Sequence, residues 1–104
     1  MQERPIPAAA LRDQDAVEML RVWIAEQKLH CSMKVGMYLE TMTIPEEDAW
    51  GVILADVTRH LAAALESGYS TNKAESILKI KDSYLTELSK PTSNAVGNFE
   101  ENAP

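Results

Sequence analysis

The strongest constraint on the fold is a strict alternation of apolar and polar side chains between residues 28 and 35. Leu29, Cys31, Met33 and Val35 fall on one side of an extended chain, and the positions between them are polar. A period of two residues is typical of a strand with one covered face. The pattern therefore predicts a strand here.

The segment before it can complete a hairpin around Glu26-Gln27. A short loop there places Leu20, Val22 and Ile24 opposite the apolar side chains of the next strand, which gathers six apolar side chains on one face. The turn lacks the Asn-Gly or Asp-Gly sequence that favours tight hairpins. A helix capped by Asp15 is the alternative for this segment.

Two amphipathic helices are expected after the hairpin. Over residues 46–67, apolar side chains recur every three or four positions, with Thr43 and Glu46 as a capping box and Gly68 as the end signal. A second helix is expected over 73–88, capped by Asn72. The connection between the two is short, so they should pack as antiparallel neighbours.

These elements predict an α+β fold, in which the hairpin packs on two antiparallel helices. We expect a helix stripe built on Trp50, Val57 and Leu61 to cover the apolar hairpin face, including Cys31. Two strands alone are marginal in water, and their edges stay unpaired. A short third strand from residues 37–42, or self-association by strand pairing, would satisfy them. Gly51, inside the first helix, indicates the close approach of something bulky, such as a second chain.

Length and composition set the outer limits. The 104 residues suit one domain, expected over 13–89, between a flexible arm at 1–12 and a disordered tail at 90–104. The net charge of −6 argues against nucleic acid or an anionic membrane as partner. A single cysteine excludes an intrachain disulfide. Residues 1–5 show no signal-like pattern, so we expect a cytoplasmic protein.

The leading candidate site is a set of four side chains on one face of the hairpin. They combine a cation, an aromatic ring, an imidazole and a hydroxyl, namely Arg21, Trp23, His30 and Ser32. Trp and Arg are favoured at protein interfaces, so we interpret this face as a contact surface for a protein partner. A site for a small anionic ligand and a plain solvated face are the alternatives.

A second candidate is the pair Asp56 and His60, one helical turn apart. A carboxylate in this position can orient an imidazole for general-base work, although such pairs also arise without a catalytic role. The same two residues, with His30 and Cys31, are also the only plausible metal ligands that include histidine or cysteine. In the expected register His30 and Cys31 point to opposite faces. We therefore expect no metal site, no catalytic residues and no cofactor.

Several short motifs resemble a family of small, mainly alphaproteobacterial proteins catalogued as a domain of unknown function. The matching segments are Pro5-Ile6-Pro7, Leu20-Arg21-Val22-Trp23, His30-Cys31-Ser32-Met33, Ala49-Trp50-Gly51 and Thr58-Arg59-His60. The resemblance covers about residues 5–65 and is weaker beyond. It implies a hairpin followed by a helix, and no activity. The family's turn usually carries Gly, where this chain has Glu26-Gln27-Lys28.

Taken together, the sequence favours a non-catalytic interaction or binding module that forms a homodimer and contacts an unknown protein partner. The alternative is a small-ligand-binding protein or an enzyme. That alternative would use His60 with Asp56, or His30 with Arg21.

Overall fold

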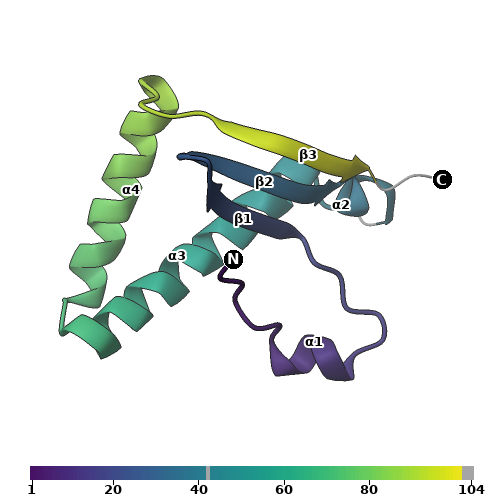
Figure 1. The fold of residues 1–104 in the computed structure, drawn as a ribbon, viewed down its shortest axis with the longest axis horizontal. Coiled ribbons are helices and arrows are strands. Elements are labelled where there is room, and N and C mark those ends of the chain that lie inside the picture. Colours follow the sequence, from purple (N-terminus) through teal and green to yellow (C-terminus); the bar gives the residue numbers. More distant parts are fainter. Residues whose placement is uncertain (42, 102–104) are drawn as a thin grey trace.

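A three-stranded mixed sheet and two long helices make up most of the molecule (Figure 1). The computed structural model describes residues 1–41 and 43–101. In chain order the elements are α1 (Ala8–Arg12), β1 (Leu20–Ala25), β2 (Lys28–Val35), α2 (Met37–Thr41), α3 (Glu46–Tyr69), α4 (Lys73–Ser89) and β3 (Ala95–Glu101). The predicted α+β class is confirmed.

The hairpin forms in the predicted register. β1 and β2 pair antiparallel, with Val22 opposite Cys31 and Trp23 opposite His30. The two turn residues, Glu26 and Gln27, both have left-handed backbones, with φ of 52° and 64°. Two left-handed residues are typical of the turn whose twist matches a hairpin, although Asn and Gly adopt that conformation more readily. The hairpin therefore forms because of the alternating pattern in β2, although the sequence of the turn does not favour it.

The third strand comes from the end of the chain. Residues 37–42 were expected to supply it, but Met37–Thr41 form helix α2, and residue 42 lies outside the described residues. Instead β3 pairs parallel with β2, and the strand order is β1-β2-β3. The predicted disorder of 90–104 is therefore wrong for Ala95–Glu101. This segment has few apolar side chains, and its order comes from backbone hydrogen bonds to the free edge of β2.

The two long helices match their predicted ranges closely. α3 continues two residues past the expected end, because Ser70, not Gly68, adopts the left-handed conformation that ends it, with φ of 59°. Asn72 caps α4 as predicted, since its side chain accepts a hydrogen bond from the Glu75 N–H at 2.9 Å. Figure 1 shows α3 passing behind the sheet, while α4 diverges from it and stands to one side. The chain returns from α4 into β3.

The predicted capping box at the start of α3 does not form. Pro45 occupies the N-cap position and no side chain caps the helix there. The Glu46 carboxylate points instead to helix α2, as described below. Thr43 loses its reciprocal partner because this longer-range contact competes for the same carboxylate.

Little of the chain is buried. Among residues whose burial is described, only Ala49 and Ala62 are buried, at 5% and 0% exposure. The hairpin face that α3 was expected to cover stays open, with Val22 51% and Ile24 82% exposed. Cys31 is only partly buried, against the prediction. In the described part of the chain, no helix is long and apolar enough to cross a membrane.

Candidate functional site

The hairpin register brings the four predicted contact residues together. Trp23 lies opposite His30, and Arg21 lies opposite Ser32, on neighbouring positions of two paired strands. Opposite residues of an antiparallel pair project to the same face. Trp23 and His30 are partly buried and Ser32 is exposed. The His30 Nε2 atom is buried and finds no hydrogen-bond partner within the described residues.

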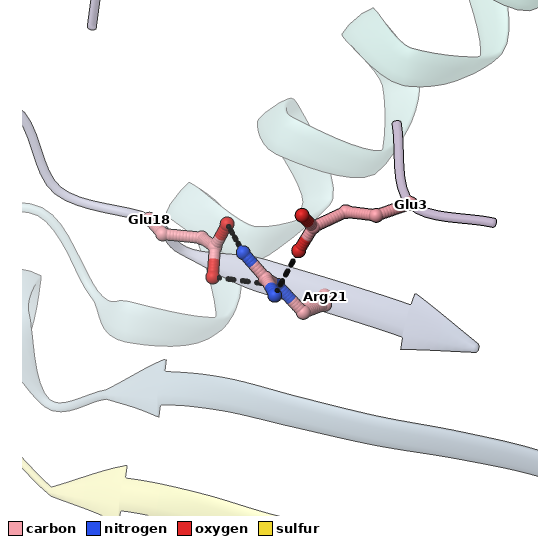
Figure 2. Close-up of polar contacts among 3 residues, drawn as sticks. All are labelled: Glu3, Glu18 and Arg21. Atoms are coloured by element: carbon pink, nitrogen blue, oxygen red, sulfur yellow. Dashed lines mark hydrogen bonds and ion pairs between the residues drawn. The ribbon is translucent and has the colours of Figure 1, made fainter. Parts of the chain in front are cut away.

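Arg21 is the charged centre of this face, and two carboxylates hold it (Figure 2). Its Nε and Nη2 atoms donate to the two carboxylate oxygens of Glu18, at 3.1 and 3.0 Å. Its Nη1 atom donates to Glu3 at 2.8 Å. The forked guanidinium matches a carboxylate with two parallel bonds. The hydrogen bonds and charge of Glu18, and those of Glu3, raise the pKa of Arg21 above its ordinary value, although partial burial opposes them.

This arrangement changes the chemistry expected of the face. A guanidinium already paired with two carboxylates offers little attraction for a further anion. Arg21 instead ties the N-terminal arm to β1, because Glu3 lies eighteen residues upstream. The arm, expected to be flexible over 1–12, also contains the short helix Ala8–Arg12.

The arm and β1 enclose an open hollow of about 660 Å³. Its lining combines apolar side chains, including Pro5, Ile6 and Trp23, with the charged side chains of Glu3, Arg4, Glu18 and Arg21. Three of these charged groups, Glu3, Glu18 and Arg21, are already paired with one another. The indole of the candidate contact face is therefore accessible from the edge of the sheet. A hollow of this kind suits an apolar side chain of a partner better than a charged ligand.

The second candidate pair is not assembled. Asp56 accepts a charge-assisted hydrogen bond from Arg59 instead of orienting His60. His60 is exposed on α3, while His30 lies on β2, and neither lines the hollow beside the arm. Within the described residues, no three His, Cys, Asp or Glu side chains converge as a metal site would require.

Among the described residues, Glu46 accepts more hydrogen bonds than any other carboxylate, whereas its local sequence predicted only a capping role. It accepts hydrogen bonds from the backbone N–H groups of Gly36, Tyr38 and Leu39, at 3.0, 2.9 and 3.0 Å. It also accepts one from Trp50 Nε1 at 2.9 Å. Partial burial by itself would raise the pKa of this carboxyl, but the hydrogen bonds lower it below the ordinary value. Glu46 thereby joins the end of β2 and helix α2 to the start of α3.

Glu87 plays a similar part near the end of α4. Its carboxylate accepts hydrogen bonds from the Thr92 N–H at 2.8 Å and from the Thr92 hydroxyl at 2.6 Å. These bonds lower the pKa of Glu87, against a small opposing effect of burial. They direct the chain after Pro91 towards β3. The only local sequence signal for either role is a glutamate beside a proline or glycine turn.

The sequence between residues 3 and 92 matches the profile of a known protein family. The chain belongs to the domain of unknown function family DUF5076. The resemblance seen in the motifs is thus confirmed, and the match extends well beyond residue 65. The range that characterises DUF5076 includes Glu3, Arg21, Glu46 and Glu87, and it ends before β3.

One solved structure resembles this DUF5076 chain over most of its length. It comes from the photosynthetic bacterium Rhodopseudomonas palustrus CGA009 and was described provisionally as a pyruvate dehydrogenase. The TM-score is 0.65 and the sequence identity 24%, and the alignment covers 92% of each chain. At this identity the likeness supports the fold alone. No match was found among curated proteins.

Proposed function

We propose that this DUF5076 chain is a non-catalytic interaction module that acts as a homodimer. The observation that carries the proposal is the exposed area of the single chain, 8775 Å². A folded monomer of 11.6 kDa is expected to expose roughly 5,800 Å². The radius of gyration, 15.6 Å, also exceeds the ~13 Å expected for a compact chain of this length.

The excess area has the size of an interface. It amounts to about 3,000 Å² per chain, whereas a stable standard interface hides about 800 Å² per partner. Large apolar residues with substantial exposure occur on β1, α3, α4 and β3, including Val22, Val57, Leu85 and Phe99. Isolated monomers rarely leave so much apolar surface in water. A second chain is the simplest cover for it.

The face built on Arg21, Trp23, His30 and Ser32 is the surface proposed for a protein partner. Trp23 is accessible beside the hollow along β1, and a partly buried aromatic ring with a paired arginine is typical of interface anchors. The lone cysteine and the acidic balance suit a cytoplasmic partner better than nucleic acid.

The geometry gives weaker support to the ligand-binding or enzymatic alternative. That alternative needs His60 next to a free Asp56, or a free Arg21 next to His30. Both charged groups already have partners, Arg59 for Asp56 and two glutamates for Arg21. The dehydrogenase description belongs to the similar protein and supports no reaction here.

The mass of the purified chain in solution tests the homodimer. Light scattering over a range of concentrations should give twice the 11.6 kDa of one chain. A strict monomer at all concentrations would overturn the dimer. For the contact face, Trp23→Ala should reduce capture of a protein partner from the native cell extract, whereas Lys79→Ala, on the exposed side of α4, should not.

A further inference from the structure

Helix α3 carries an apolar stripe that its own chain leaves substantially exposed. Leu54, Val57 and Leu61 are all substantially exposed. At about 100° per residue, they fall within an arc of roughly 60° on the helix surface. The two buried alanines, Ala49 and Ala62, each lie about 110° round the helix from the centre of this arc, one on either side of it. The stripe therefore runs between the two sides of α3 that the chain does cover.

Helix α4 carries a matching stripe. Leu78, Leu85 and Leu88 are each more than half exposed, and they fall within an arc of about 80°. The more buried side of α4 holds Ile77 and Ile80 and packs against α3. Each helix thus packs one side against the other helix of the α3–α4 pair and leaves a second, apolar side exposed to water.

The direction of the α3 stripe indicates what it can bind. Ala62 and Ile80 are each nine residues from Thr71, at the centre of the α3–α4 connection, and Ala62 is buried while Ile80 is partly buried. We therefore take Ala62 to mark the side of α3 that faces α4. The stripe lies about a quarter turn round from that side. A helix in a four-helix bundle contacts two neighbours in directions about a quarter turn apart. One neighbour is α4, and the side of α3 a quarter turn away is the exposed stripe.

We propose that two copies of this chain join through these stripes, so that two α3–α4 hairpins form an intermolecular four-helix bundle. The inference rests on the homodimer proposed above and names its interface. A second copy is the favoured occupant because the excess area of about 3,000 Å² per chain is several times what a stable dimer needs. Each copy also supplies an amphipathic helix pair that fits the other.

Details of the stripes agree with close helix packing. On α3 the stripe continues as Ala64 and Gly68, small residues that allow another helix to approach. Apart from the neighbouring backbone of α3 itself, no atom of the described residues lies within 4 Å of the position that a Cβ would take at Gly68. On α4 a single charge, Lys81, interrupts the stripe. A lysine at such a position can lay its aliphatic stem on apolar neighbours and keep its ammonium group in water. The four sheet residues, among them Trp23, stay free for another partner.

Two valines on α3 provide a matched test. Val57 in the stripe is 56% exposed, and Val52 is 61% exposed but lies about 170° round the helix from the stripe centre. Val57→Glu should weaken self-association by about 100-fold or more, because it places a charge in an apolar interface. The mass by light scattering should fall to that of one chain. Val52→Glu should keep the dimer mass.

Cross-linking gives a second measurement that does not depend on a destabilised variant. Cys31 is the only cysteine, so the Cys31→Ser chain can receive single cysteines. Leu85→Cys in that background should form cross-linked dimers with a short bifunctional maleimide, and Val52→Cys should not. Circular dichroism should show that both variants keep the helix content of the parent chain.

The outcomes separate this inference from the proposed function. A dimer that survives both Val57→Glu and Leu85→Glu, or that cross-links equally from Val52→Cys, overturns the helical interface. If only Trp23→Ala dissociates the dimer, the sheet face is the interface. That result supports the homodimer and overturns the four-helix bundle. A wild-type monomer overturns both. Dissociation by Val57→Glu together with an intact Trp23→Ala dimer supports the bundle.

Discussion

The sheet and the helix pair are held together by different kinds of interaction. The three strands are joined by backbone hydrogen bonds, with each residue of β2 paired on both sides over most of its length. The helices α3 and α4 contact each other through small and medium side chains, of which only Ala62 is fully buried among the described residues. The loops around both regions are anchored by carboxylates, including Glu46 and Glu87.

The difference shows what one chain can and cannot complete. Backbone pairing needs only a neighbouring strand, and the chain supplies three. Helical stability in proteins comes mainly from burying an apolar face, and the α3–α4 pair leaves much of that face open. We therefore expect substitutions within the chain to affect mainly the stability of the sheet. The stability of the helices should depend on whether a second copy is bound.

The largest effect is expected at Gly97. Its φ is +139°, and a Cβ there would overlap the Cys31 carbonyl oxygen on the neighbouring strand. Gly97→Val should detach β3 and lower the free energy of unfolding by about 3 kcal/mol, a loss typical of strain at a special backbone conformation. Hydrogen exchange of the β2 amides, with urea unfolding at fixed protein concentration, measures the effect.

A glycine in the helix pair provides the contrast. Apart from the neighbouring backbone of α3 itself, no atom of the described residues lies within 4 Å of the position that a Cβ would take at Gly51. Helical alanine is about 1 kcal/mol more favourable than glycine. Gly51→Ala should therefore stabilise the chain. If Gly97→Val were tolerated as well as Gly51→Ala, the parallel pairing of β3 with β2 would be wrong.

The next largest effect on stability is expected at Glu46, which joins the end of the sheet strand β2 to the start of helix α3. Its hydrogen bonds lower its pKa below the ordinary value of a glutamate in the folded state. A group with a depressed folded pKa contributes stability that is present above its unfolded pKa and is lost as the pH falls through the folded one. Glu46→Gln should lower stability at neutral pH. It should also weaken the loss of stability that the parent chain shows as the pH falls below about 4.5, the ordinary pKa of a glutamate. Its exposed neighbour is the control: Glu47→Gln should leave both unchanged.

The hairpin and the two long helices follow from local patterns, which is why they were predictable. The alternation in β2 determines which residues of β1 it pairs with, and that register places Arg21, Trp23, His30 and Ser32 side by side. Local spacing also predicts α3 and α4 to within two residues at either end.

The remaining features depend on contacts between distant residues. The strand Ala95–Glu101 is specified by the free edge of β2 and by Gly97, not by its own apolar pattern. Glu46 resembles a capping residue locally, and its partner Gly36 lies ten residues upstream. The ion pair of Arg21 with Glu3 could not be predicted, because the two residues are eighteen positions apart in the sequence.

A smaller effect is expected at the hairpin turn. Glu26 and Gln27 both hold left-handed backbones, which cost a non-glycine residue about 1 kcal/mol or more each. Replacing the pair by Asn-Gly, the sequence most suited to this turn, should raise the free energy of unfolding by about 1 kcal/mol. Urea unfolding measures it. A loss of stability would mean that the turn has a different conformation.

The smallest effect on stability is expected for a substitution at Arg21. This substitution tests whether the arm is attached to the sheet through the arginine. The ion pairs of Arg21 with Glu3 and Glu18 are exposed to solvent, and exposed pairs contribute little to folding. Arg21→Ala should thus leave the unfolding midpoint nearly unchanged and release the arm, so that trypsin cleaves faster after Arg12. Lys79→Ala, which removes an exposed pair on α4, should leave that rate unaltered. An unchanged rate in Arg21→Ala would mean that the arm is held by its contacts along β1, and that the arginine serves the contact face alone.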